Sequence, residues 1–161
     1  MQIGDMCNRN VICAARDATV ATAAKLMREH RVGDVIVVDR ADAQRMPIGI
    51  VTDRDIVVKV VALGADPDTV TLGELTSWGQ LATVQETDTL GDTIHLMHAK
   101  GVRRIPVING TGVLVGIVSM DDMLPRSVAE LSELVDLAAR GRLGEETRTS
   151  AARNPEPREA K

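Results

Sequence analysis

The chain carries one short motif twice, as GIVTDRD at residues 49–55 and as GIVSMDD at residues 116–122. In each copy an apolar run ends at a hydroxyl residue, and an aspartate follows three residues later, Asp55 in the first copy and Asp122 in the second. A hydroxyl followed at that spacing by an acid is typical of a capping box at a helix start. Each motif therefore predicts a strand that leads directly into a helix.

These two motifs close the two copies of a longer internal repeat. The matched blocks keep the same order in both copies and are residues 3–6 with 72–75, 24–27 with 94–97, 32–39 with 102–109, and 49–52 with 116–119. The expected strands cover residues 11–14, 35–38 and 48–51 in the first copy and 81–84, 105–108 and 114–118 in the second. Each copy thus reads βαββα, and the predicted fold class is α+β.

The first helix of each copy is expected to begin at a threonine, Thr19 or Thr89, because a threonine hydroxyl can cap the free backbone amides of the first turn. The apolar faces of these helices are predicted at Val20, Ala24 and Met27 in the first copy and at Leu90, Ile94 and Met97 in the second.

The second helix of the first copy, residues 53–63, is apolar nearly all round, since residues 56–63 read IVVKVVAL. Such a helix is buried on more than one side, and a unit of about 60 residues cannot supply that burial alone. We therefore expect two stacked repeats, and a second chain, to cover it. The prediction is a homodimer.

The repeats are assigned to residues 1–66 and 67–124, a C-terminal helix to residues 125–143 and a polar tail to residues 144–161. Pro125 is expected to interrupt the helix that begins at Ser119. Ser127 and Glu130 then form a capping box for a new helix. Its apolar stripe is predicted at Val128, Leu131, Leu134, Val135 and Ala138, before a stop at Gly141.

The composition excludes several classes of function. The chain has 161 residues, no Phe or Tyr and a single Trp, which argues against aromatic stacking on single-stranded nucleic acid. A net charge of −4 gives no attraction to a polyanion. No apolar run is long enough to span a membrane, and two cysteines, Cys7 and Cys13, are too few for a disulfide framework. We expect a cytoplasmic protein with reduced thiols.

The duplicated motif resembles the closing motif of cystathionine-β-synthase-type (CBS) domains, and the segment GVRRIPV at residues 101–107 resembles the entry to the family's second strand. The resemblance covers residues 1–124 in two copies. It implies a pseudo-two-fold pair of repeats with two ligand clefts, which commonly bind AMP, ADP, ATP or S-adenosylmethionine, and a dimer in the form of a flat disc. The implied function is a ligand-sensing regulatory module. The alternative is a dimeric, stress-associated interaction scaffold that needs no ligand.

The resemblance also implies a set of ligand-binding residues, which are Thr52, Asp55, Ser119, Asp122, Arg103, Arg104, Ile105 and Pro106. An ionised aspartate accepts hydrogen bonds, and a ribose diol offers two donors. One of the two arginines could grip a phosphate through a forked contact, although both could equally be surface residues. The first copy has Gly33 and Asp34 at the equivalent positions, so we expect the cleft of the second copy to suit a charged nucleotide better.

Metal binding and catalysis are not predicted. His95 and His98 lie three residues apart on a helix, but their counterparts in the first copy are Lys25 and Arg28, which cannot ligate a metal at neutral pH. No set of nucleophile, base and orienting group is apparent. The expectation is a protein that is not an enzyme, requires no cofactor, takes an adenine nucleotide as its regulatory ligand and acts on an unidentified partner protein.

Overall fold

The structure, a computed structural model, describes residues 2–39, 45–76, 80–125, 127–129 and 131–135. The chain divides into two compact units, Met1–Asp122 and Met123–Lys161. The first unit contains both copies of the repeat, and each unit is considered by itself below.

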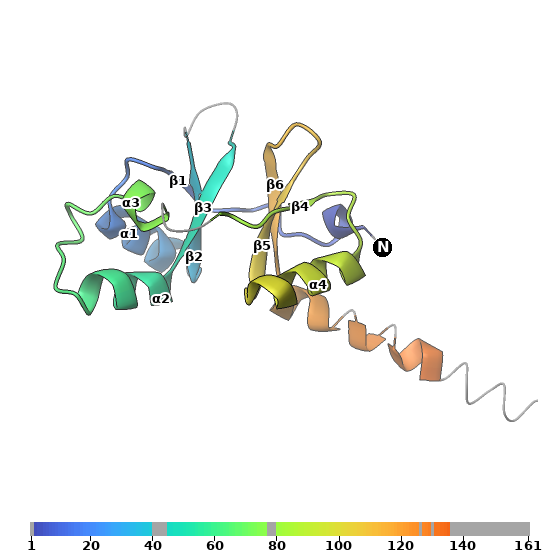
Figure 1. Ribbon diagram of the computed structural model, residues 1–161. Coiled ribbons are helices and arrows are strands. Elements are labelled where there is room, and N and C mark those ends of the chain that lie inside the picture. The colour runs from blue at the N-terminus through green and yellow to red at the C-terminus, as the bar shows by residue number, and fades with distance from the viewer. Residues whose placement is uncertain (1, 40–44, 77–79, 126, 130, 136–161) are drawn as a thin grey trace, which may run out of the picture. The chain divides into compact units, whose positions relative to one another are not determined.

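Both copies have the element order that the repeat predicts (Figure 1). The first copy consists of β1 (Cys13–Ala15), α1 (Val20–His30), β2 (Asp34–Val38), β3 (Pro47–Thr52) and α2 (Asp53–Ile56), which continues into the π-helical turn η2 (Val57–Val61). The second copy consists of β4 (Val84–Gln85), α4 (Leu90–Lys100), β5 (Arg104–Ile108) and β6 (Leu114–Ser119), followed by a helix from residue 120. The predicted α+β class and the βαββα order are confirmed.

Each copy builds its own three-stranded sheet, with the orders β1-β2-β3 and β4-β5-β6. The first two strands of each sheet are parallel, and the last two are antiparallel. The register shifts between Val37 and Val38 in one sheet and between Val107 and Ile108 in the other. The two copies therefore match down to the position of this irregularity.

The helix caps follow the prediction, but the buried face of the helices does not. The hydroxyl oxygen of Thr19 accepts a hydrogen bond from the Thr22 amide, and that of Thr89 accepts one from the Asp92 amide, both at 3.2 Å. The buried residues are Val20, Ala23 and Met27 in α1 and Thr93 and Met97 in α4.

The predicted face was wrong at Ala24 and Ile94, which are exposed. The buried stripe includes Thr93, whose hydroxyl donates to the Thr89 carbonyl at 2.9 Å and is thereby satisfied within the helix. A polar side chain with a local partner can lie on a buried face, and simple apolar spacing does not detect it.

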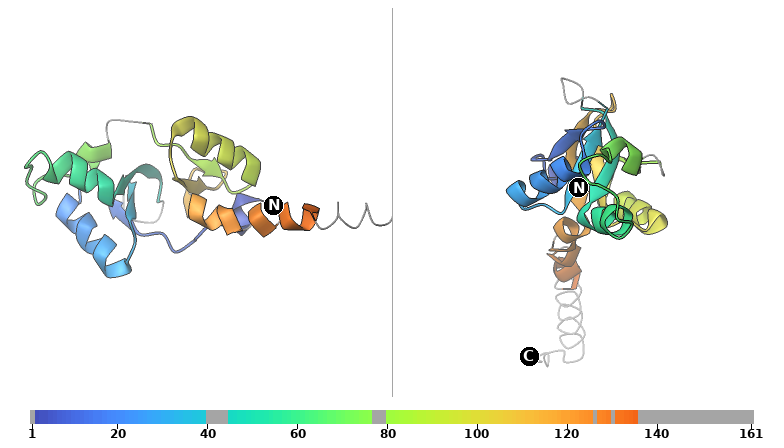
Figure 2. Two further views of the ribbon diagram at one scale, coloured as in Figure 1. Left: turned by 90° about the horizontal axis from the view of Figure 1, so that it is seen from below. Right: turned by 90° about the vertical axis from the view of Figure 1, so that its left-hand side faces the viewer.

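The first segment of each copy packs on the opposite copy. The turn η1 (Ile3–Asp5) lies beside the second sheet, where the Gly4 amide donates to the Glu86 carbonyl at 2.8 Å (Figure 1, Figure 2). The helix α3 (Leu72–Thr76) lies on the first copy, where the Gly73 amide donates to the Arg16 carbonyl at 2.8 Å. The repeat boundary predicted at residue 66 divides the sequence but does not describe which segments pack together.

Two equivalent glycines allow the first segment of each copy to pack closely on the other copy. A Cβ atom at Gly49 in β3 would collide with the side chain of Thr76 in α3, and one at Gly116 in β6 would collide with the side chain of Cys7. Any side chain at either position would push away the segment that comes from the other copy. The glycine that opens each GIV motif therefore serves packing between the copies.

The apolar core of the first copy lies between its sheet and its helices. Val35, Val37 and Val51 of the sheet pack with Val60 of η2 and Leu72 of α3, and all five are at most 1% exposed. The buried residues of this core are all valine, leucine, alanine or methionine, which agrees with the near absence of aromatic residues in the sequence.

The helix predicted over residues 53–63 departs from expectation in its geometry, because it changes from α-helix to a π-helical turn at Val57. The chain by itself buries only one side of it, as the sequence led us to expect: Val60 is fully buried, whereas four apolar neighbours are 51–77% exposed. These four are Val57, Val58, Val61 and Leu63.

Residues 120–125 are helical through Pro125, and residues 127–129 are helical as well. Residue 126, where the predicted interruption would follow Pro125, lies outside the described residues. The predicted cap at Ser127 is not observed, because residue 127 is itself helical and its hydroxyl donates to the Met123 carbonyl one turn earlier, at 3.1 Å. Glu130, Ala138, Gly141 and the tail lie outside the described residues. In the described part, Val128, Leu131, Leu134 and Val135 are 60–62% exposed.

None of the helices in the described part of the chain has the length and apolar character needed to cross a membrane.

Candidate functional site

A pocket of about 360 Å³ lies in the first unit, and both copies of the repeat contribute to its walls. The first copy supplies Gly49 and Ile50 of β3, Asp55 of α2 and Lys59 of η2. The second copy supplies Lys100, Val102, Arg104 and Pro106. The remaining walls come from α3 and the segment after it, at Leu75, Thr76, Gln80, Leu81 and Ala82.

Asp55 is held in place at the start of α2 by the predicted capping box. Its Oδ2 atom accepts hydrogen bonds from the Thr52 amide at 3.0 Å and from the Thr52 hydroxyl at 2.7 Å. In return, the Asp55 amide donates to the Thr52 hydroxyl oxygen at 3.2 Å. The Oδ1 atom faces the Lys59 ammonium at 2.8 Å, one helical turn further on. The carboxylate therefore has a fixed position at the pocket wall.

The same contacts keep this carboxylate ionised. Burial by itself raises the pKa of Asp55, but the hydrogen bonds from Lys59 and Thr52 and the charge of Lys59 outweigh that effect, so the pKa is lowered from its ordinary value. At neutral pH Asp55 is an acceptor of hydrogen bonds and cannot donate one.

The pocket wall carries more positive than negative charge. Lys59, Lys100 and Arg104 contribute cations, and Asp55 is the one carboxylate among the described lining residues. Low-dielectric walls strengthen the field of charges that line a cleft. This balance suits a ligand that combines hydroxyl donors with an anionic group.

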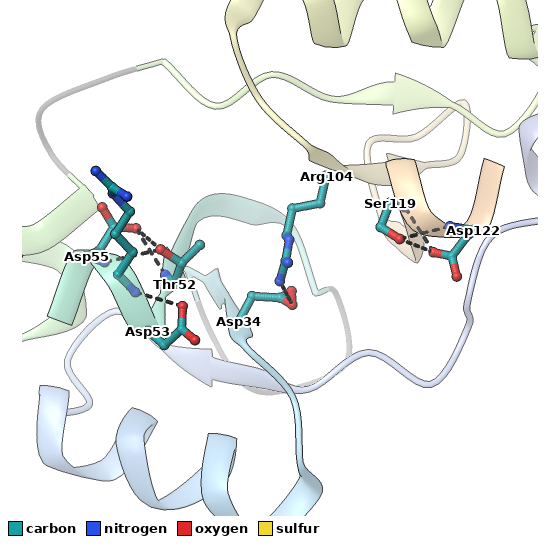
Figure 3. A network of polar contacts seen from close by, with 8 residues as sticks. Asp34, Thr52, Asp53, Asp55, Arg104, Ser119 and Asp122 are labelled. Atoms are coloured by element: carbon teal, nitrogen blue, oxygen red, sulfur yellow. Dashed lines mark hydrogen bonds and ion pairs between the residues drawn. The ribbon is translucent and has the colours of Figure 1, made fainter. Parts of the chain in front are cut away.

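Arg104 also forms an ion pair that links the two copies. Its Nη1 atom lies 2.6 Å from the Oδ1 atom of Asp34, and the two side chains are 33% and 16% exposed. Figure 3 shows this pair between the two hydroxyl–aspartate motifs, with the Arg104 side chain extended from the second copy toward Asp34 of the first.

Three of the eight predicted site residues line this pocket, namely Asp55, Arg104 and Pro106. Thr52 does not line the pocket, but its amide and its hydroxyl both donate hydrogen bonds to Asp55. Successive side chains of β5 point to opposite faces of the sheet, and that of Ile105 is fully buried in the core. Arg103 points elsewhere, with its side chain 72% exposed and its Nη2 atom 3.9 Å from Asp121.

The second motif forms the same capping box away from this pocket. The Asp122 Oδ2 atom accepts from the Ser119 amide at 3.0 Å and from the Ser119 hydroxyl at 2.6 Å. That the second copy's cleft suits a charged nucleotide better stays a prediction, but Arg104 of the second copy shares a pocket with Asp55 of the first copy. A strand of one copy reaches the motif of the other, which the order of residues does not reveal.

Two lining cations, Lys59 and Lys100, were not predicted. The sequence could have predicted Lys59, because it follows Asp55 by four residues on a helix and so lies on the same face. Lys100 is the last residue of α4, and no sequence pattern places it near Asp55. Within the described ranges, no group of three or more His, Cys, Asp or Glu side chains could hold a metal ion.

Residues 3–62 and 72–128 each match the family described as the CBS domain. The chain belongs to the CBS domain family. Hypoxic response protein 1 of Mycobacterium tuberculosis is 38% identical to it over 119 residues, which cover 74% of this chain and 80% of the relative.

The solved structures of CBS domain proteins agree with this fold. A crystal structure of Hypoxic Response Protein I with two coordinated zinc ions has a TM-score of 0.68 and 35% identity, covering 78% of this chain and 98% of the other. A CBS domain protein from Pyrobaculum aerophilum complexed with AMP has a TM-score of 0.68 and 25% identity, covering 76% and 89%. A hexameric CBS-CP12 protein from bloom-forming cyanobacteria has a TM-score of 0.68 and 32% identity, covering 94% and 91%.

Proposed function

We propose that this CBS domain protein is a regulatory module, not an enzyme, which binds an adenosine-containing nucleotide in the pocket of Asp55. AMP, ADP, ATP and S-adenosylmethionine are the candidate ligands. The observation that carries the proposal is the presence, in one pocket, of an ionised aspartate fixed at a helix start and three cations.

The pocket supplies a suitable group for each part of such a ligand. The Oδ2 atom of Asp55 already accepts two hydrogen bonds from Thr52, whereas Oδ1 faces only Lys59, so Oδ1 has one acceptor site left for a hydroxyl donor of a ribose. Arg104 and Lys100 can bind a phosphate, the arginine through a planar fork. The apolar wall residues can cover an adenine ring, and they are Ile50, Leu81, Val102 and Pro106.

The AMP complex of the Pyrobaculum aerophilum protein supports this proposal, since that protein has the same fold and binds a ligand of this class. We propose no required cofactor and no metal as part of the function. The nucleotide acts as a regulatory ligand, and an unidentified protein responds to the bound state.

We further propose that the chain forms a homodimer. The four exposed apolar side chains of residues 57–63 support this, because a second copy could cover them. The hexameric CBS-CP12 protein, which resembles this chain over 94% of its length, supports self-association in general.

The test is ligand binding by the full chain and by Asp55→Asn. A thermal-shift screen of adenosine, AMP, ADP, ATP and S-adenosylmethionine identifies the ligand, because binding to the folded state raises its stability. Calorimetry should then show that Asp55→Asn weakens binding on the order of tenfold to a hundredfold, which corresponds to the loss of a charged hydrogen bond of about 1.5–3 kcal/mol.

Asp92→Asn is the matched control, because Asp92 also pairs with a capping threonine, Thr89, at 2.6 Å but does not line the pocket. It should leave the affinity unchanged. If no adenosine-containing ligand binds the native chain down to millimolar affinity, the proposal is wrong. The ligand-independent dimeric scaffold would then be the better account.

A further inference from the structure

The ion pair between Asp34 and Arg104 joins equivalent positions of the two copies. Residues 32–39 align with residues 102–109, so Asp34 is the first-copy counterpart of Arg104, and each is the first residue of its strand, β2 or β5. Had both copies kept the same residue, two like charges would face each other here. The divergence of the copies has instead produced an acid and a base that pair at 2.6 Å.

This pair differs from an ordinary surface ion pair in its burial. Asp34 is 16% exposed and Arg104 is 33% exposed, whereas Arg16 and Asp39, which pair at 3.1 Å, are 60% and 55% exposed. Water and salt screen a partly buried pair less than an exposed one. Asp34 therefore offsets much of the charge of Arg104.

Arg104 is at the same time one of the three cations of the pocket. Asp34 does not line the pocket, but it engages the arginine from outside, through Nη1. An anionic group of a ligand that approaches Arg104 meets a guanidinium that a carboxylate of the protein already neutralises. Two acceptors then share one set of donors in a fixed fork geometry.

We propose that Asp34 is a built-in competitor of the ligand's phosphate for Arg104, and so sets how much the phosphate of an adenosine nucleotide adds to binding. The inference rests on the proposed function. Asp34 acts through Arg104 and not by contact with the ligand. Its removal frees the guanidinium for the phosphate and leaves the recognition of ribose and adenine as it was.

The experiment measures the affinities of adenosine and AMP by calorimetry for the full native chain and for Asp34→Asn. Asparagine keeps the size of the side chain and can still accept a hydrogen bond, but it removes the charge. The expected result is AMP binding that is tighter by roughly threefold to tenfold, as one charged contact is gained. The adenosine affinity should stay within about twofold. Should Asp34→Asn fail to fold, Asp34→Ser provides the same measurement.

Two further variants separate competition from a structural effect. In an Arg104→Gln background, Asp34→Asn should no longer change the ratio of the AMP and adenosine affinities, because the residue through which it acts is gone. Asp39→Asn is the matched control: it removes the same charge from the exposed pair with Arg16, and it should leave both affinities unchanged.

The outcomes separate this inference from the function on which it rests. An unchanged ratio of AMP to adenosine affinity in Asp34→Asn, with both ligands bound, overturns the inference and leaves the proposed function intact. A ratio that rises equally in the Arg104→Gln background also overturns it. If neither ligand binds the native chain, the proposed function is wrong and the inference fails with it.

Discussion

Asp55 illustrates how one side chain can stabilise a helix and also face a pocket. Its backbone and one carboxylate oxygen complete a capping box with Thr52, while the other oxygen is paired with Lys59. The capping contacts hold the carboxylate still, and a pre-positioned group loses little conformational freedom when it binds a ligand. Structural and functional readings of the motif are therefore compatible, and variants at this position must be tested for both.

The lowered pKa of Asp55 predicts a pH-dependent contribution to stability. A carboxyl group whose pKa is lower in the folded state stabilises the fold fully above its ordinary value of 3.8, and the contribution is lost as the pH falls through the lower folded value. Asp55→Asn should therefore lower the melting temperature at neutral pH, with a cap worth about 1 kcal/mol, and the difference should shrink below about pH 4.

NMR titration of the Asp55 carboxyl gives a direct check. Lys59→Gln removes one of the groups that lower the pKa, so the titration midpoint should rise in that variant. A midpoint that does not move would show that Lys59 has no influence on this carboxyl.

At the scale of elements, the decisive feature is that each leading segment packs on the opposite copy. The turn η1 and the helix α3 are related by the repeat, and each packs close to the glycine of the other copy's last strand. Because Gly49 lines the pocket and Thr76 packs against it, this packing also shapes one wall of the site.

Gly116→Ala should destabilise the protein by about 1–3 kcal/mol, because the new methyl group would overlap with the Cys7 side chain that lies against Gly116. Thermal and urea unfolding measure the effect. Combining it with Cys7→Ala removes the nearest sulfur atom and should restore part of the loss.

Gly110→Ala is the control within the same hairpin, since no atom lies within 4 Å of a Cβ at that position. It should change the free energy of unfolding by less than about 0.5 kcal/mol. Equal destabilisation by the two alanines would contradict the packing explanation.

At the scale of the whole molecule, the exposed apolar side chains of residues 57–63 are the feature that bears on self-association. Val57, Val58, Val61 and Leu63 are more than half exposed and adjacent, while Val60 between them is buried. Several exposed apolar side chains so close together in the sequence are typical of an interface. The two sides of this helix therefore have separate roles, one in the core and one at the surface.

The proposed dimer predicts opposite behaviour for these two sides. Val57→Asp combined with Val61→Asp should yield a folded monomer in light scattering, because a charge would have to be buried without a partner in the dimer. Val60→Asp should instead unfold the chain, as its side chain lies in the core. Met46→Asp, at an exposed apolar residue away from this helix, is the control and should keep the native molecular mass.

A native chain that is a stable monomer at micromolar concentration would contradict the dimer. Loss of circular dichroism signal in the Val57 and Val61 double variant would show that these side chains support the fold and not an interface.

The sequence predicted the helix caps and the hydroxyl–aspartate boxes, because each depends on residues close together in the chain. It also predicted the element order, because both copies of the repeat show the same local patterns. Thr19, Thr89 and the Thr52–Asp55 box act over three or four residues, where spacing alone defines the geometry. The resemblance to a family implied eight site residues, and three of them line the pocket, namely Asp55, Arg104 and Pro106.

Tertiary structure alone decided which of these local pieces meet. Arg104 shares a pocket with Asp55 of the other copy, pairs with its own counterpart Asp34, and leaves Arg103 in solvent. The burial of Thr93 was likewise invisible in the pattern. The physical reason is common to all of them: contacts between residues far apart in the chain depend on how two sheets and their helices pack, and no local spacing encodes that arrangement.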